Sequence, residues 1–176
     1  METKWNLDKM HSEVGFKVKH MMITNVSGSF GDFDISATTS GDDFSSAQFN
    51  FSAVVDSIST GVADRDAHLK SDDFFNAEKY PVMTFKSTDV TKKDDENYTI
   101  TGDMTIRDVT KKVAFDAEFG GIVQDPYGQT KAGLTLNGKL KRSEYGLKWS
   151  AVTEAGSIVV SDDIKLHGEV QLVKQA

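Results

Sequence analysis

Hydrophobic side chains recur at every second position along most of the chain, with polar or small residues between them. A period of two places alternate side chains on opposite faces of a β-strand, so each such segment predicts a strand with one apolar face. One-faced strands favour antiparallel pairing, because the strands of parallel sheets are buried on both faces. The segments with this alternation are 14–18, 49–55, 83–85, 98–106, 113–119, 134–140 and 164–172.

Clusters of Asp, Gly, Asn and Ser separate these segments, notably at 40–43, 93–97 and 125–128. Such residues are typical of turns. Between positions 26 and 37 the alternation slips by one residue between Phe30 and Phe33, which predicts a bulge or bend near Gly31-Asp32. The pattern therefore predicts about eight antiparallel strands, arranged as a barrel or a sandwich.

The segment 64–76 does not follow this pattern. Its apolar residues, including Leu69 and Phe74, fit no period of two, and acidic residues occupy what would be the first turn of a helix, with Thr60 or Asp64 as its cap. One or two short helical turns are expected here, where they could close one end of a barrel. A second short turn or helical piece is expected at 143–146. The length of 176 residues suits one domain spanning the whole chain, 1–176.

The predicted inner face is rich in bulky apolar groups, since the chain has 11 Phe and 6 Met. Glycines at the inward positions 102, 138 and 168 would leave gaps between them. An eight-stranded barrel is near the size at which side chains either fill the interior or surround one small ligand. The pattern alone leaves a packed core and a hydrophobic ligand tunnel both open.

Charge and composition exclude several classes of partner and chemistry. The formal net charge is −7 and the chain has only three arginines, which argues against nucleic acid as a partner. Without cysteine there are no disulfides, thiol nucleophiles or thiolate metal sites. No stretch approaches the length of a membrane span, and no apolar leader is seen. A soluble, cytoplasmic protein is expected from the chain as given, or a periplasmic one if a signal peptide has been removed.

Motifs for catalysis and metal binding are missing from the sequence. There is no Gly-x-Ser-x-Gly, no P-loop and no Gly-x-Gly-x-x-Gly. The four histidines, at positions 11, 20, 68 and 167, have no spacing that is typical of metal ligands. Carboxylates are plentiful, but none lies on an apolar face where burial would raise its pKa. We therefore expect no enzyme activity, no metal and no cofactor.

Several ordered segments resemble the YceI-like polyisoprenoid-binding family, and the resemblance covers almost the whole chain. The opening carries Trp, Asp, His-Ser, Phe and His at positions 5, 8, 11–12, 16 and 20. The other matching segments are Arg65-Asp66-Ala67-His68-Leu69, Tyr80-Pro81-Val82-Met83-Thr84-Phe85 and Arg142-Ser143-Glu144-Tyr145-Gly146. The chain departs from the family pattern at Asp103 and at Arg107-Asp108, where a turn glycine is usual.

The resemblance implies an all-β fold, an extended lipocalin-like antiparallel β-barrel of about eight strands with a short helical segment near residues 64–76. It also implies a non-enzymatic protein that binds, transports or stores a long-chain amphiphile, such as a polyisoprenoid or isoprenoid quinone, in the lumen. The residues expected to line the lumen are Phe16, Val18, Phe30, Phe49, Phe51, Met83, Phe85, Ile100, Met104, Phe115 and Leu136.

A polar head group would be held at the mouth of the barrel by cations or backbone amides. The candidates are Arg65, His68 and Arg142, the sparse cations beside the irregular segments. For Arg65, an ion pair with a nearby Asp that organises the helical loop is an alternative role. The alternative for the whole protein is a stress-response or structural interaction module whose barrel is filled. The resemblance is also compatible with a homodimer, which no residue pattern demonstrates.

Overall fold

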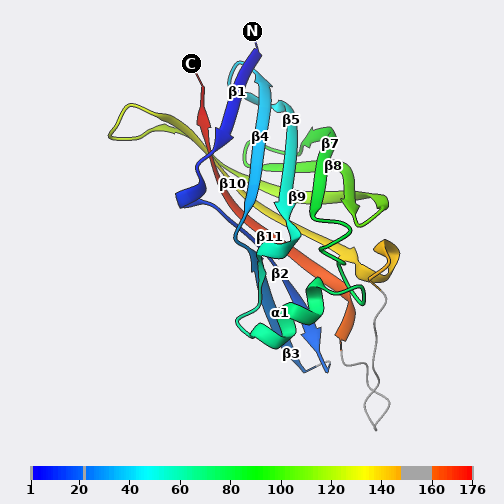
Figure 1. Cartoon of the computed structure of the whole chain (residues 1–176). Coiled ribbons are helices and arrows are strands. Elements are labelled where there is room, and N and C mark those ends of the chain that lie inside the picture. Colours follow the sequence, from blue (N-terminus) through cyan, green and yellow to red (C-terminus); the bar gives the residue numbers. More distant parts are fainter. Residues whose placement is uncertain (1, 22, 148–159, 176) are drawn as a thin grey trace.

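The computed structural model describes residues 2–21, 23–147 and 160–175, which form eleven strands and one α-helix (Figure 1). The helix is α1 (Ala63–Lys70), and three short 3-10 helices are η1 (Lys9–His11), η2 (Val55–Ser57) and η3 (Arg142–Tyr145). The strands are β1 (Glu2–Leu7), β2 (Glu13–His20), β3 (Thr24–Phe30), β4 (Phe33–Ser40), β5 (Asp43–Val54), β6 (Ile58–Ser59), β7 (Val82–Lys92), β8 (Asn97–Ile106), β9 (Val109–Gln124), β10 (Thr130–Lys141) and β11 (Val160–Lys174).

Eight strands close into a ring in the order β1, β4, β5, β7, β8, β9, β10, β11, with β11 pairing back to β1. Neighbouring strands run antiparallel throughout the described chain, so the predicted antiparallel barrel of about eight strands is confirmed. In β8 every second residue from Tyr98 to Ile106 is buried, as the alternation predicted. The sheet continues from β11 through β2 and β3 to β6.

Three long strands of the sheet are each interrupted once, and the three interruptions lie next to one another. Along β11, β1 pairs with residues 172–174 and β2 with residues 160–169, so β1 and β2 form one interrupted strand around η1. Next to it, β4 pairs with β1 and β3 pairs with β2, with the break at Gly31-Asp32. The third break is η2, between β5 and β6. We call these three breaks the kink line. The bend predicted at Gly31-Asp32 is part of it.

The kink line is held by hydrogen bonds to backbone carbonyls that link its three members. The amide of Gly31 donates to the carbonyl of Ser57 at 3.1 Å, and the amide of Val54 donates to that of Asp32 at 2.9 Å. From η1, the Lys9 ammonium donates to the carbonyl of Gly31 at 2.7 Å. Beyond this line, β2, β3 and α1 lie at the end of the molecule opposite the chain termini (Figure 1).

The end of the barrel near the termini is packed solid. Trp5 and Leu172 are fully buried, and the ring of Trp5 lies 5.0 Å from that of Phe44 between centroids. Phe44 in turn lies 5.0 Å from Phe119, which contacts Tyr98. The indole N–H of Trp5 donates to the Thr39 hydroxyl at 2.9 Å, so the polar atom of this core is paired.

Two of the inward glycines do not leave the gaps that the sequence suggested. A Cβ at Gly138 would lie 2.6 Å from Cδ1 of Phe115, and one at Gly102 would lie 2.7 Å from Cζ of Phe85. A phenylalanine ring from the adjacent strand therefore covers each of these positions, and that expectation was wrong for them. The error arose because the sequence of one strand does not show which residue of the adjacent strand lies beside its glycine. That depends on the register of the two strands. At Gly168 the nearest atoms would be 3.6 Å away, an ordinary contact.

The irregular segment contains the predicted helix in its first part only. α1 ends at Lys70, and residues 72–75 and 77–79 form turns, so Phe74 and Phe75 lie outside the helix. Neither predicted cap is used: the N-cap is Val62, whose side chain makes no capping hydrogen bond. Phe74 is nonetheless buried, and the ring of Phe75 meets Phe30 edge-on at 6.2 Å. The segment therefore covers the barrel end beyond the kink line.

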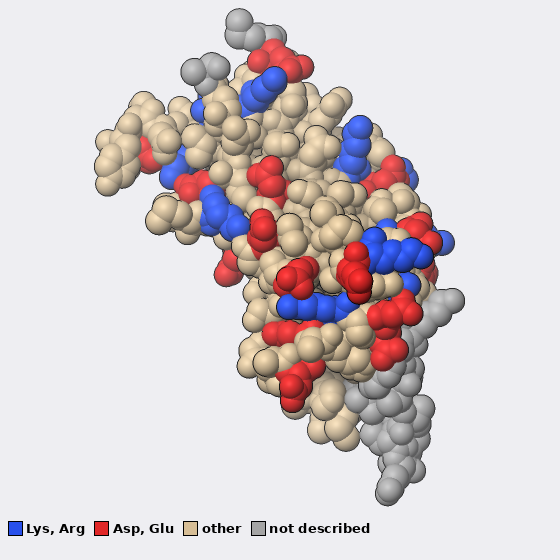
Figure 2. Space-filling model, in the orientation of Figure 1, with Lys and Arg blue, Asp and Glu red and all other residues tan. Residues whose placement is uncertain are grey.

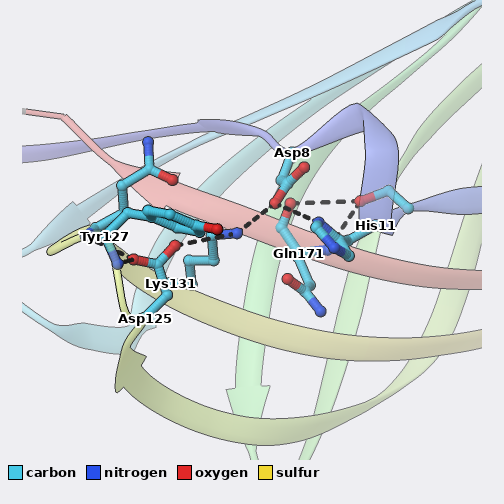
Figure 3. Close-up of polar contacts among 8 residues, drawn as sticks. Asp8, His11, Asp125, Tyr127, Lys131 and Gln171 are labelled. Atoms are coloured by element: carbon cyan, nitrogen blue, oxygen red, sulfur yellow. Dashed lines mark hydrogen bonds and ion pairs between the residues drawn. The ribbon is translucent and has the colours of Figure 1, made fainter.

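A cluster of ion pairs ties the hairpin between β9 and β10 to the start of the chain (Figure 3). The Lys131 ammonium contacts the carboxylate of Asp8 at 2.6 Å and that of Asp125 at 3.4 Å, and its side chain is 14% exposed. His11 bonds the same Asp8 carboxylate at 2.9 Å. Mainly through the Lys131 hydrogen bond, the pKa of Asp8 is lowered, and that of Lys131 is raised in turn. We call Asp8, Lys131 and Asp125 the Lys131 cluster.

Replacing Gly138 by Ala is expected to destabilise the barrel by about 1–3 kcal/mol, because the Phe115 ring must move away from the new methyl group. Urea unfolding of the purified variant measures this. The matched control is Gly168→Ala, where the added methyl group meets only ordinary contacts and the free energy of unfolding should stay equal or rise. Equal losses in the two variants would contradict the account of Gly138.

Replacing Lys131 by Met should lower the free energy of unfolding at neutral pH. Below about pH 4 the same replacement should lower it much less. Lys131 holds the pKa of Asp8 below that of an unfolded carboxyl, about 4. The resulting stability is present above that value and is lost as the pH falls through the lower folded value. Because the pKa of Lys131 is raised, its own contribution is lost only above about pH 10.

Urea unfolding of wild type and Lys131→Met between pH 3 and pH 9 tests this dependence. The control is Lys93→Met, which removes an exposed ion pair with Asp116 and should change stability little at any pH. A difference between wild type and Lys131→Met that is as large at pH 3 as at pH 7 would rule out the assignment.

Candidate ligand-binding cavity

Two cavities lie end to end inside the barrel. The wide cavity has a volume of about 380 Å³ and lies beneath α1, and the narrow cavity, of about 100 Å³, lies deeper in the barrel. They share four wall residues, Phe16, Phe30, Met83 and Leu166. The wide cavity falls in the range of small-molecule sites, about 300–1,000 Å³. The barrel is therefore packed at one end and hollow at the other.

The eleven residues that were expected to line the lumen all lie on the walls of these cavities. Val18, on β2, lies on the wide cavity, and Phe16, Phe30 and Met83 lie on both. The remaining seven line the narrow cavity: Phe49, Phe51, Phe85, Ile100, Met104, Phe115 and Leu136. Their role in holding a ligand remains a proposal.

Sequence reasoning missed ten of the fourteen apolar residues on the wall of the wide cavity. Four of these residues, Ile106, Leu140, Ile164 and Leu166, belong to the alternating strands and could have been chosen from their inward phase. The others come from irregular segments or strand ends, where no period assigns a face. They are Val26, Leu69, Phe74, Phe75, Leu147 and Val160.

Polar residues also line the wide cavity, and the three predicted head-group residues are among them. The polar wall residues are Lys19, His20, Thr60, Asp64, Arg65, His68, Arg142 and Tyr145. The structure thus brings Arg65, His68 and Arg142 to one cavity, although they come from α1 and η3. What each side chain can offer a ligand depends on its own hydrogen bonds.

Arg65 is held by Thr60 at the entry to α1. Its Nε donates to the Thr60 hydroxyl at 2.7 Å and its Nη2 donates to the Thr60 carbonyl at 2.8 Å. The Thr60 hydroxyl and amide both donate to the carboxylate of Asp66. Arg65 therefore organises the loop through Thr60, and the described residues give it no direct ion pair with an Asp.

His68 and Arg142 have well-defined protein contacts. His68 Nε2 bonds Asp73 at 2.8 Å, and its ring meets Phe74 edge-on at 5.1 Å. Arg142 is buried, and its guanidinium donates to the backbone carbonyls of Leu147 at 2.8 Å, Ser161 at 2.9 Å and Val160 at 3.1 Å. Burial lowers the pKa of Arg142, and the nearby Asp162 opposes this. Arg142 thus joins η3 to the start of β11 within the wall.

Arg107 fixes the segment that follows α1 and covers the barrel end, which we call the covering segment (residues 71–80). The sequence did not indicate this role. It occupies the β8–β9 turn at φ +56°, a left-handed conformation that costs a non-glycine residue roughly 1–2 kcal/mol. Its guanidinium donates to the carbonyls of Asp72 and Phe74 at 3.1 and 3.0 Å and to the Asp72 carboxylate at 3.1 Å. It also lies over the ring of Tyr80. These side-chain contacts join the β8–β9 turn to residues 72–74 and Tyr80.

The charged side chains of the described residues form no metal site, and their most closely knit cluster lies away from the cavities. Among the described residues no three His, Asp or Glu side chains gather to hold a metal ion. The most closely knit charged group, the Lys131 cluster, lines neither cavity, and its charges are paired with one another. In the ranges that the structure describes, no helix is long and apolar enough to cross a membrane. On the face shown in Figure 2, basic and acidic side chains are interspersed.

Several solved structures share the fold of this chain. A Campylobacter jejuni YceI protein of known structure is 38% identical, with a TM-score of 0.77 and 97% of each chain covered. Burkholderia cenocepacia BcnA has the same fold, with a TM-score of 0.79 at 19% identity, covering 94% of this chain and 98% of BcnA. A polyisoprenoid binding domain from Saccharophagus degradans, at 13% identity, has a TM-score of 0.64, covering 97% of this chain and 98% of that domain.

The sequence comparisons agree with the structural ones. A UPF0312 protein of Staphylococcus epidermidis is 35% identical over 170 residues, which is 96% of either chain. The model of the YceI-like domain matches residues 5–172, from the buried Trp5 of β1 to the buried Leu172 of β11. This chain therefore belongs to the YceI-like family.

Proposed function

We propose that this protein binds a long-chain amphiphile of the polyisoprenoid class inside its barrel and carries or stores it without chemical change. The observation that supports the proposal best is the pair of end-to-end cavities, whose walls are built mainly from Phe, Leu, Ile, Val and Met side chains. An apolar chain entering from the wide cavity can continue past Phe16, Phe30 and Met83 toward the narrow one. A lumen of this form suits a ligand that is long and thin.

The physical chemistry of the wall favours such a ligand. Each methylene transferred from water contributes about 0.8 kcal/mol, so a few isoprene units supply a large driving force even after the costs of ordering the chain. Methionine adapts to irregular shapes, and Met83, at the junction of the two cavities, can adjust to methyl branches. The name of the Saccharophagus degradans domain, a polyisoprenoid binding domain of the same fold, supports the same ligand class.

An interaction module with a filled barrel is the alternative. The aromatic packing around Trp5, Phe44 and Phe119 agrees with it, because these rings contact one another inside that end of the barrel. The two functions differ in what the purified protein contains. Organic extraction of protein from its native source, followed by mass spectrometry, should release a lipid with a stoichiometry near one per chain. Repeatedly empty extracts would favour the filled module.

A bulky side chain in the wide cavity should weaken lipid binding. Val18→Trp places an indole where the ligand would lie. Displacing two methylene groups costs ~1.6 kcal/mol, so the affinity for a C20 isoprenoid alcohol, geranylgeraniol, should fall roughly tenfold or more. Titration of delipidated protein, followed by native mass spectrometry, measures this change.

Lys17→Trp is the matched control, because Lys17 is the neighbouring residue on β2 and is exposed on the outer face. It should bind geranylgeraniol as the wild type does. Circular dichroism checks that both variants keep the barrel. Equal affinities for wild type, Val18→Trp and Lys17→Trp would exclude the wide cavity as the binding site.

A further inference from the structure

Tyr145, the last residue of η3, has a buried hydroxyl group without a partner. The side chain is 1% exposed and belongs to the wall of the wide cavity. Within the described ranges its hydroxyl makes no hydrogen bond to the protein. Native proteins pair nearly all buried hydroxyl groups, because an unsatisfied one keeps the cost of leaving water. This hydroxyl therefore has an unused hydrogen-bonding capacity and belongs to a residue of the cavity wall.

The surroundings of Tyr145 restrict what can bind there. The wall next to it is formed largely by apolar side chains, among them Ile106, Leu140 and Leu147. Arg142, three residues earlier on η3, directs its guanidinium at backbone carbonyls. Burial raises the pKa of Tyr145 to about 12, with a smaller contribution from Glu144, so the hydroxyl keeps its proton at neutral pH and can donate it.

We propose that Tyr145 donates a hydrogen bond to an uncharged oxygen on the ligand, a hydroxyl, carbonyl or ether, and so seats the polar end of the chain in the wide cavity beneath α1. This inference rests on the proposed function and makes it more specific. A diphosphate would bring several charges against an apolar wall, and one phenol group would not compensate for their lost hydration. Two cations of the same wall, Arg65 and Arg142, already direct their guanidinium groups at protein oxygens.

A second buried hydroxyl without a partner provides an internal comparison. Thr99, on β8, also has no hydrogen bond to its hydroxyl in the described ranges, but it lines neither cavity. If an unpaired hydroxyl were only a local packing feature, removing it at either position would have the same consequence for ligands. If the Tyr145 hydroxyl binds the ligand, only its removal should change affinity.

The experiment compares wild type, Tyr145→Phe and Thr99→Val, each delipidated and titrated with three C20 probes. These are geranylgeraniol, geranylgeranyl diphosphate and the isoprenoid hydrocarbon phytane, with binding followed by native mass spectrometry. Tyr145→Phe should weaken geranylgeraniol binding by about threefold to tenfold, the value of one hydrogen bond, and leave phytane binding unchanged. Thr99→Val should bind all three probes as the wild type does. Wild type should prefer the alcohol to the diphosphate.

The melting temperature of the delipidated protein gives a second readout, in which Tyr145→Phe is expected to lose nothing. Tyr145→Phe removes an unpaired buried hydroxyl while keeping the ring, so the delipidated variant should melt at the same temperature as wild type or higher. Added geranylgeraniol should then raise the melting temperature less in Tyr145→Phe than in wild type.

The outcomes separate this inference from the proposed function. If wild type binds none of the probes, both are overturned. If it binds them, but Tyr145→Phe loses equally for alcohol and hydrocarbon, or for neither, the hydrogen bond is overturned and lipid binding stands. Tighter binding of the diphosphate than of the alcohol would also overturn the assignment of an uncharged polar end.

Discussion

The barrel depends on the closure of its backbone hydrogen bonds through β11. One edge of this strand pairs with β10 along residues 163–173, and the other edge pairs first with β2 and then with β1. Because the change of partner occurs at η1, one long strand joins the packed end of the barrel to the hollow end. Closing the ring gives each of its eight strands a neighbour on both sides, which limits the strand edge that is open to association with another sheet.

The two ends of the barrel use their apolar residues differently. Near the termini, Trp5 and Phe44 meet in the middle and fill the space. Toward the other end, the rings of Phe85 and Phe115 lie against the wall, over glycines of the neighbouring strands. A ring that lies over a glycine occupies little of the interior, so the same type of residue closes one end and lines an open space at the other. The kink line and the segment fixed by Arg107 then cover that space.

The alternation of side chains predicted much of this structure because it acts within one strand. The alternation within residues 14–18 and 98–106 shows which side chains point inward, without knowledge of the neighbouring strands. Once the barrel closes, inward residues of both segments lie on the cavity walls. Features that depend on two strands at once were not predictable. The rings over Gly102 and Gly138 required the register.

The short breaks and the cations were the other weak points of the sequence analysis. η1 and η2 are three residues long, too short to leave a periodic signal. Scarce arginines suggested head-group ligands, yet burial gave Arg142 a role in joining η3 to β11, and Arg107 anchors the covering segment. A charged side chain in a turn resembles a solvated one until its partners, here backbone carbonyls distant in sequence, are known.

Where a phenylalanine ring lies over a glycine, the substitutions that the two positions accept during evolution depend on each other. A relative that acquires a side chain at position 138 must shrink or redirect the aromatic group at 115 at nearly the same time, since either change alone crowds the wall or opens a hole in it. At position 102 the backbone carbonyl of Lys86 also lies against the site, so a change of the ring at 85 would not make room for a side chain. Lumen width in such barrels would then change in paired steps. Relatives whose lumens differ in width can be compared at positions 115 and 138 together.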